Sequence, residues 1–285
     1  MIRAENFING QFEGCEGYLD SFEPGTGEVW AQIPDSGAEE VDRAVQAAKE
    51  AFKSWKKLSV NQRSQYLIKA ANLLEQRLDE FAIAESRDQV KCKSYFNVRL
   101  FLNLIIFQGK TVKMAKTVDI PRAVLNLRAF ATGQCHLLET SNELVEAGVI
   151  NYTKRSPVGV AGLIAPWNLP LYLLTFKIGP ALMAGCTVVC KPSEMTSVTA
   201  WMLCKIFQES GLPCGVLNLV CGLGNKAGEA IVRHPDVKVI SFTGSTLIGR
   251  HIAQVAGKKL CLFTKSSHMK SQIMITFGDD SSTHP

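Results

Sequence analysis

The sequence predicts an α/β protein with a doubly wound parallel sheet, and three observations support this fold class. From residue 158 onward, apolar strand-like runs alternate with helix-like runs. The strand-like runs are apolar along their whole length, which is typical of parallel strands covered on both faces. The chain has 285 residues, of which 46% are apolar and 20% charged, so it is long and apolar enough to bury a large core.

Composition also excludes several classes of protein. A net charge of +5 with no dense basic stripe argues against nucleic acid as a partner. No apolar run is long enough to span a bilayer, and the opening residues 1–6 do not resemble a signal peptide, so we expect no membrane partner. The nine cysteines have no framework spacing and are expected to be reduced thiols of a cytoplasmic protein. Cys186 and Cys190 are expected to be buried thiols, and no metal site is predicted.

The first part of the chain predicts a scaffold. Residues up to about 34 are expected to form short strands and turns, with a turn at residues 23–28. Two capping-box patterns, at residues 36–39 and 59–62, predict the starts of two amphipathic helices. The apolar face of the first helix is expected to carry Val41, Ala44, Val45, Ala48, Phe52 and Trp55, and that of the second Leu67, Ala70, Ala71, Leu74, Leu78 and Phe81.

The second part predicts the sheet itself. Ligands of parallel α/β sheets bind beyond the carboxyl ends of the strands, so the residues that follow each strand are the candidates for function. The predicted strands are residues 158–165, 187–190, 216–220 and 239–242. The predicted helices are residues 170–183, 196–209 and about 225–233, with another beginning near Ser245.

Four short motifs follow these strands: residues 165–170 (APWNLP), 191–194 (KPSE), 222–228 (GLGNKAG) and 242–249 (FTGSTLIG). Each motif alone has a purely structural interpretation. Trp167 could be a packing residue and Asn168 an ordinary turn residue. In the second motif, Lys191 and Glu194 could form a solvent-exposed ion pair. The third motif could be a tight turn and the fourth a helix cap. Their occurrence together, at adjacent strand ends and in this order, is more specific.

This order of motifs resembles the aldehyde dehydrogenase superfamily. Its three cofactor-side signatures are similar to residues 166–168, 191–194 and 242–246. The resemblance extends from about Phe7 to Lys259. It implies a doubly wound NAD-binding domain made of residues 1–133 and 156–257.

The motifs also suit a dinucleotide physically. The Ser245 hydroxyl and the amides of a helix N-terminus would hold a phosphate, which Gly244 would let approach closely. Glu194 would accept hydrogen bonds from the adenosine ribose and would repel a 2′-phosphate, so NAD is favoured over NADP. The resemblance implies that the Asn168 amide donates to the oxyanion during catalysis. The candidate cofactor-binding residues are Ile164, Ala165, Pro166, Trp167, Lys191, Glu194, Gly224, Gly228, Phe242, Gly244, Ser245 and Ile248.

The family reaction needs further residues. A cysteine thiolate attacks the aldehyde, hydride passes to NAD, and a glutamate activates water. The resemblance stops before the family's Glu-Leu-Gly-Gly motif, so residues 258–285 are predicted to be a non-family tail and the catalytic domain to be missing. Neither Cys135 nor Cys261 is expected to replace the nucleophile. We therefore expect the chain alone to bind NAD weakly and not to oxidise aldehydes.

Two further segments depart from an ordinary domain. Residues 90–108 are predicted to be a non-family insertion, in which eight of the ten residues 98–107 are apolar. Such a segment must pack on existing surface or expose a β-prone stretch. Residues 134–155 resemble the family's oligomerisation arm, although an ordinary surface hairpin is an equal alternative.

Three function hypotheses therefore stand. The chain is an NAD-dependent aldehyde-oxidising enzyme that needs the missing domain. Alternatively, it is a catalytically dead NAD-binding fragment, which forms a homo-oligomer or associates with full-length subunits. As a third hypothesis, it is an unstable, non-functional splice product.

Overall fold

The computed structural model describes residues 1–89, 110–133, 136–137, 140–259, 261–266 and 273–275. The predicted insertion at residues 90–108, Cys135 and most of the predicted tail lie outside these ranges. None of the helices among the described residues is both long and apolar enough to cross a membrane.

The main sheet confirms the predicted fold class. Within the described residues it has eight strands in the order β13-β12-β11-β8-β9-β10-β2-β3, and the five from β12 to β10 are parallel. The parallel strands are β8 (Val160–Ile164), β9 (Thr187–Lys191), β10 (Leu217–Leu219), β11 (Val237–Thr243) and β12 (Leu262–Ser266). Antiparallel strands at the edges are β2 (Asn6–Ile8), β3 (Gln11–Glu13) and β13 (Ile273–Ile275).

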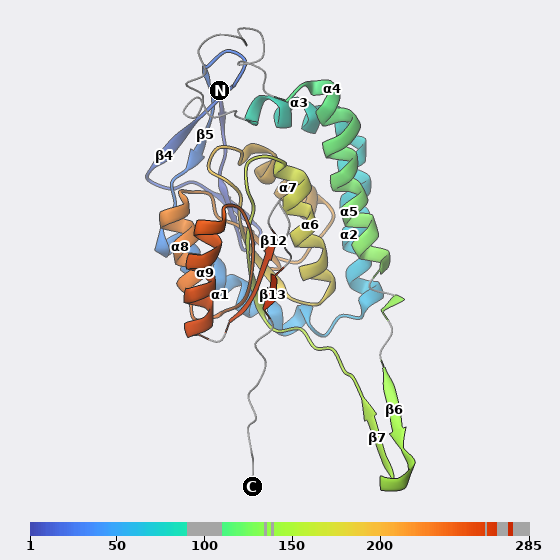
Figure 1. Cartoon of the computed structure of the whole chain (residues 1–285). Coiled ribbons are helices and arrows are strands. Elements are labelled where there is room, and N and C mark those ends of the chain that lie inside the picture. The colour runs from blue at the N-terminus through green and yellow to red at the C-terminus, as the bar shows by residue number, and fades with distance from the viewer. Residues whose placement is uncertain (90–109, 134–135, 138–139, 260, 267–272, 276–285) are drawn as a thin grey trace, which may run out of the picture.

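Both faces of this sheet are covered by helices. Successive side chains of a strand point to opposite faces, so each strand contributes to two hydrophobic cores. In β8, Ala161 and Leu163 join one hydrophobic core, whereas Val160 and Ile164 join the other. Figure 1 shows the helices in two corresponding layers. One layer holds α1 (Ala38–Trp55), α8 (Glu229–Arg233) and α9 (Thr246–Lys258); the other holds α2 (Val60–Gln76), α3 (Leu78–Asp88), α5 (Ile120–Gly133), α6 (Pro170–Met183) and α7 (Val198–Glu209).

The first 34 residues form short strands and turns, as predicted. A separate three-stranded sheet has the order β1-β5-β4, and its strands flank the turn expected at residues 23–28. They are β1 (Ile2–Arg3), β4 (Tyr18–Phe22) and β5 (Val29–Pro34). Ahead of α5, a short α4 (Val112–Met114) runs into a π-helical turn (Ala115–Asp119), which the sequence analysis did not identify.

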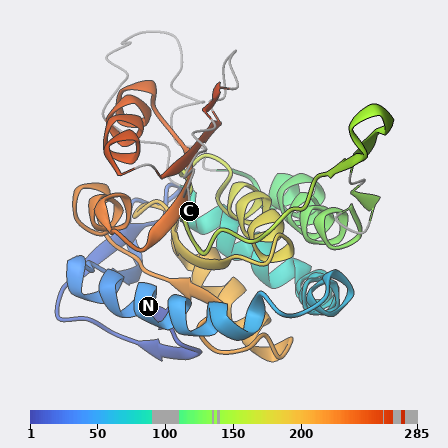
Figure 2. The same ribbon diagram turned by 90° about the horizontal axis from the view of Figure 1, so that it is seen from below.

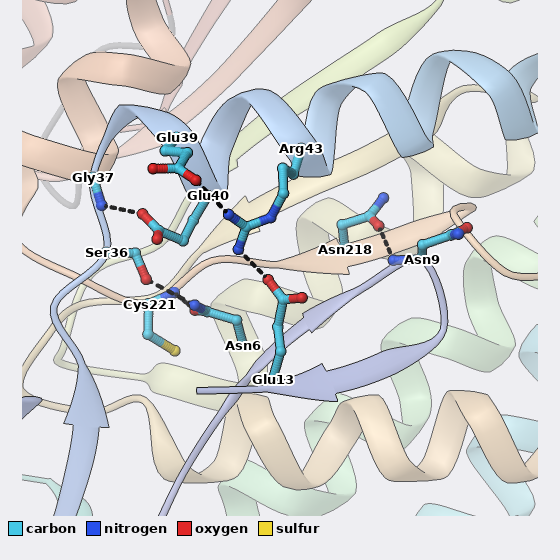
Figure 3. A network of polar contacts seen from close by, with 10 residues as sticks. All are labelled: Asn6, Asn9, Glu13, Ser36, Gly37, Glu39, Glu40, Arg43, Asn218 and Cys221. Atoms are coloured by element: carbon cyan, nitrogen blue, oxygen red, sulfur yellow. Dashed lines mark hydrogen bonds and ion pairs between the residues drawn. The ribbon is translucent and has the colours of Figure 1, made fainter. Parts of the chain in front are cut away.

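The first capping box is displaced by one residue from its predicted position. Gly37, not Ser36, is the N-cap of α1, and its amide donates to Oε2 of Glu40 at 2.8 Å. The Ser36 hydroxyl instead accepts a hydrogen bond from Asn6 Nδ2 at 2.8 Å, and Glu39 pairs with Arg43 (Figure 3). The predicted position was wrong by one residue, since Glu40 and not Glu39 accepts from the N-cap amide, which belongs to Gly37.

The second predicted helix is two helices. Its start is as expected, since the Ser59 hydroxyl accepts from the amide of Gln62 and the Gln62 side chain accepts from the amide of Ser59. The helix ends at Gln76, because Arg77 has φ −103° and ψ 21°, outside the helical region. Leu78 and Phe81 therefore belong to α3 and not to α2.

A two-stranded hairpin extends away from the rest of the chain in both views (Figures 1 and 2). It pairs β6 (Ser141–Leu144) with β7 (Val149–Tyr152), and all eight strand residues are exposed. The hairpin lies in the segment for which the sequence predicts an oligomerisation arm.

Candidate functional site

The candidate site lies where the connections of the sheet diverge. From β8 the chain passes through α6 to β9 on one side, whereas β11 and β12 lie on the other side of β8. The buried face of α6 packs into one core and that of α9, which follows β11, into the opposite one. The carboxyl ends of β8 and β11 therefore border a crevice, which is where ligands bind in open parallel sheets.

A cleft of about 630 Å³ occupies this crevice. All twelve predicted cofactor-binding residues line it: Ile164 ends β8, and the other eleven come from the four strand-end motifs. The remaining lining residues are Ser193, Met195, Leu223, Asn225, Glu229, Val232, Thr243, His251 and Ile252. Asn168, the predicted catalytic residue, is half-buried and is not among the described lining residues.

Lys191 and Glu194 lie side by side, with different exposure. The Lys191 ammonium is buried and donates to the carbonyls of Pro192 at 2.6 Å and Gly222 at 2.8 Å. It also lies 3.4 Å from Glu194 Oε2, whose side chain is 35% exposed. Burial lowers the pKa of Lys191, and the Glu194 charge opposes that shift. The lysine is thus held by the backbone, which leaves the carboxylate open to the cleft.

Helix α9 presents its N-terminus to the cleft. Ser245 is the N-cap, and its hydroxyl accepts from the amide of Ile248 at 3.3 Å. The first amides of a helix lack intrahelical partners and favour anions. A Cβ added at Gly244 would lie 2.5 Å from the ring of Phe242, so a larger residue at this position would require the ring to move.

The connection between β8 and α6 forms another wall. Trp167 is exposed at the rim, with 39% of its surface accessible. The main chain of its neighbour Asn168 is held by α3, because the Asn168 carbonyl accepts a hydrogen bond from Gln89 Nε2, at the end of that helix. Helix α6 then begins at Pro170, a residue suited to the first turn because its missing N–H would have no helical partner there.

Sequence reasoning missed a polar pair on the opposite wall. His251 Nε2 lies 2.8 Å from Glu229 Oε2, and Arg233 Nε lies 2.6 Å from Glu229 Oε1. Burial alone would raise the pKa of Glu229, but the hydrogen bonds from His251 and Arg233 lower it. The two residues lie on different helices and 22 positions apart, so no local sequence pattern joins them.

A buried lysine behind the cleft was also missed. Lys177 of α6 donates to Ser241 Oγ of β11 at 2.9 Å. Burial lowers its pKa to about 7. In the sequence, this residue appears only as one polar position in an apolar helix.

Cys221, the residue before Gly222, is held by Asn6 of β2 and by Ser36 (Figure 3). Asn6 donates to the Ser36 hydroxyl, and its Oδ1 accepts from the amide of Cys221 at 2.9 Å. Ser36 in turn donates from its amide to the carbonyl of Cys221 at 3.2 Å. Gly222 has φ +145°, and a Cβ there would lie 2.8 Å from the Ser36 carbonyl oxygen. Its carbonyl is one of the acceptors of Lys191, so this network positions the lysine.

Comparison with curated proteins gives consistent results. The chain is 50% identical over 265 residues to 2-aminomuconic semialdehyde dehydrogenase of Homo sapiens, and 52% identical over 261 residues to that of Danio rerio. These alignments cover 92% and 90% of this chain, and 50% of each relative. The chain thus spans about half the length of the curated relatives it matches. The sequence also resembles this vertebrate dehydrogenase in its motifs, and these identities confirm that resemblance.

Solved structures give the same fold. An NAD⁺ complex of an aldehyde dehydrogenase from Bacillus cereus superposes with a TM-score of 0.83 at 33% identity, over 93% of this chain and 51% of that one. An indole-3-acetaldehyde dehydrogenase in complex with NAD⁺ superposes with a TM-score of 0.84 at 31% identity, over 94% and 51% of the two chains.

A family-wide match covers most of the sequence. The model described as "Aldehyde dehydrogenase family" matches residues 12–100 and 99–276. The two matched segments meet within residues 90–108, where the sequence predicts an insertion. With the fold, the strand-end cleft and the relatives already described, this match shows that the chain belongs to the aldehyde dehydrogenase family.

Proposed function

We propose that the cleft binds NAD and that the chain carries the nucleotide-binding half of an NAD-dependent aldehyde dehydrogenase. The observation that supports this most strongly is that residues of all four strand-end motifs, between residues 165 and 249, line one cleft of about 630 Å³. We assign this half to residues 1–133 and 156–257. The solved relatives named above contain NAD⁺ in their complexes.

The residues of the cleft suit the parts of the dinucleotide. The N-terminus of α9, with Gly244 and Ser245, would hold a phosphate. The Glu194 carboxylate would accept hydrogen bonds from the ribose, with Lys191 beside it. Gly224 and Gly228 leave room for the adenosine, and an added Cβ at Gly224 would meet nothing within 4 Å. When bound, NAD supplies the hydride acceptor.

We infer that the complete enzyme oxidises an aldehyde to a carboxylate. The names of the curated relatives point to semialdehydes such as 2-aminomuconic semialdehyde. We propose that the reaction belongs to the kynurenine pathway. The Asn168 amide would donate to the oxyanion of that reaction. A cytoplasmic location is in keeping with the free cysteines among the described residues.

The covalent step needs a thiolate, and the described residues offer none at the cleft. No cysteine is among the described lining residues. Cys261 is buried, and burial raises the pKa of its thiol, which opposes formation of a nucleophile. We therefore propose that the chain binds NAD and does not turn over aldehydes unaided.

Thermal stabilisation by nucleotide tests the binding proposal. NAD at about 100 times its Kd stabilises a protein by about 2.7 kcal/mol, so the melting temperature should rise with NAD concentration. Glu194→Gln should weaken the response to NAD and reduce the preference over NADP. Glu209→Gln removes a charge from a surface ion pair with Arg77 and is the matched control. A melting temperature unchanged by NAD in a cooperatively folded sample would contradict the proposal.

Turnover separates the hypotheses. NADH formed from an aldehyde by the pure chain would contradict the proposed inactivity and identify an enzyme. NAD-dependent stabilisation without NADH formation identifies a catalytically inactive nucleotide-binding fragment. A broad, non-cooperative melt with neither signal identifies an unstable product, since a domain has only about 5–15 kcal/mol of stability to lose.

A second proposal concerns assembly through the hairpin. Its exposed apolar side chains include Val145, Ile150 and Tyr152, and both strands have free edges among the described residues. We propose that it pairs with another copy or with a full-length subunit. Light scattering after size-exclusion chromatography should show an oligomer that Ile150→Glu converts to monomer. Glu143→Gln, on the same hairpin, is the control.

A further inference from the structure

Two buried carboxylates of α3 lie behind the cleft. Glu85 and Asp88 are one helical turn apart, and neither has any accessible surface. Glu85 Oε1 accepts from the amide of Leu171 at 3.2 Å, and Oε2 accepts from the Thr199 hydroxyl at 2.7 Å. Glu85 thus joins the first turn of α6 to the first turn of α7.

Asp88 makes the matching pair of contacts. Its Oδ2 accepts from the amide of Val198 at 2.8 Å, and its Oδ1 accepts from the Ser21 hydroxyl of β4 at 2.9 Å. The first-turn amides of α6 and α7 are therefore capped by carboxylates from a third helix. A negative charge at a helix N-terminus is favourable because of the helix dipole.

These caps replace local ones. Neither Leu169, the N-cap of α6, nor Ser197, the N-cap of α7, makes a capping hydrogen bond with its side chain. Buried first-turn amides need acceptors, so the carboxylates of α3 meet a requirement that the two helices do not meet themselves.

The capped helices follow the two connections that form the cleft. Helix α6 begins directly after Trp167 and Asn168, and α7 begins shortly after Lys191 and Glu194. Gln89, at the end of α3, also donates to the Asn168 carbonyl. One end of α3 thus contacts the first connection at Asn168 and the first turns of α6 and α7, and none of its residues is among the described lining residues of the cleft.

We propose that Glu85 and Asp88 are positioning residues of the nucleotide cleft: they fix the first turns of α6 and α7 and thereby the connections at 165–169 and 192–197. The link to nucleotide affinity rests on the proposed function. Burying two carboxylates is costly, and neutral caps would satisfy the same amides at lower cost. The arrangement is best explained by the geometry it imposes on both connections at once.

The charged groups around the pair make its protonation measurable. Burial raises the pKa of Glu85 to about 7 and that of Asp88 to about 7, and the Glu85 charge also raises the pKa of Asp88. Asp119 and Lys110, a buried ion pair, face Glu85 with opposing effects. Backbone amides and hydroxyls complete the surroundings.

Alanine and amide variants separate positioning from bulk stability. Glu85→Ala and Asp88→Ala remove the caps. In Glu85→Gln and Asp88→Asn an oxygen can still accept from the amide, while the new NH₂ donates to the Thr199 or Ser21 hydroxyl. Leu67→Ala, on the buried face of α2, is a cavity control that removes none of the hydrogen bonds at the two helix starts.

The alanine variants are expected to raise the Kd for NAD about five- to tenfold, the effect of losing one such hydrogen bond. Their amides at Leu171 and Val198 should also exchange hydrogen faster at pH values where the protein is folded. The amide variants should restore the Kd and the exchange rates to within about twofold of the wild-type values. The stability of wild type should fall as the pH rises from about 4 to about 7, and this fall should be smaller in the amide variants.

Two outcomes would overturn the inference. If the alanine variants change the Kd and the exchange rates no more than Leu67→Ala does, the carboxylates have only a general structural role. If exchange at Leu171 and Val198 is unaffected, the positioning itself is absent. Wild type that fails to bind NAD would instead defeat the proposed function, while the exchange measurement would still decide whether the two residues position the connections.

Discussion

His251 Nε2 of α9 lies 2.8 Å from Glu229 Oε2 of α8, and this contact joins the two helices that wall one side of the cleft. Burial opposes the charge on Glu229, but His251 and Arg233 lower its pKa below the ordinary value of 4.5. A carboxylate whose pKa is lower in the folded protein adds stability above its unfolded pKa and loses that contribution as the pH falls.

The expected effect of Glu229→Gln therefore depends on pH. The variant should melt at a lower temperature than wild type at about pH 7, and the difference should shrink as the pH falls below about 4.5. Melting temperatures measured from about pH 3.5 to pH 7 test this. Glu143→Gln, on the exposed hairpin, should differ from wild type at no pH. Parallel curves for wild type and Glu229→Gln would contradict the prediction.

Lys191→Met should destabilise the chain and abolish nucleotide binding. The ammonium satisfies the carbonyls of Pro192 and Gly222, and methionine would leave both without this donor. A buried polar group that loses its partner costs about 1–3 kcal/mol. Urea unfolding measures the loss of stability, and calorimetry with NAD measures binding. Wild-type stability in this variant would show that the two carbonyls find other donors.

Lys177→Met should change how stability varies with pH. The folded pKa of about 7 is below the unfolded value of 10.5, so the unfolded chain binds more protons between these values. Stability from this residue therefore rises with pH from about 7 to about 10, by at most about 1.4 kcal/mol per pH unit. The variant should lose this rise. Denaturant unfolding at several pH values would detect it, and an unchanged slope would contradict the assigned burial of the charge.

Gly244→Ala should weaken nucleotide binding more than it lowers stability. The added Cβ would lie 2.5 Å from the Phe242 ring, which must move either into the cleft or against α9. Such overpacking costs about 1–3 kcal/mol. Gly257→Ala, near the end of the same helix where a Cβ meets nothing within 4 Å, is the control. Equal Kd values for NAD in the two variants would count against a cleft at this position.

Much of the fold follows from local patterns. Helix α6 has the predicted bounds, and strands β8 to β11 lie where apolar runs were identified. These elements were predictable because their strands are buried on both faces and glycine or proline separates them from the helices. The same patterns predicted that the four strand-end motifs would meet.

Other features depend on partners far away in the sequence. The Ser36 hydroxyl accepts from Asn6, 30 positions earlier in the chain, and the first helix is capped at Gly37 instead. Glu229 and His251, like Glu85 and Leu171, meet only through tertiary packing. Local periodicity also misses the change of backbone angle at Arg77 that separates α2 from α3.

Gly222 shows what such convergence implies. Its φ of +145° favours glycine, a Cβ added there would lie 2.8 Å from the Ser36 carbonyl oxygen, and its own carbonyl accepts from the buried Lys191. A single methyl group at this point would push against the N-terminal strands on one side and dislodge the Lys191 ammonium on the other. Gly222 thus connects the packing of the first forty residues of the chain to the position of Lys191 in the proposed NAD site.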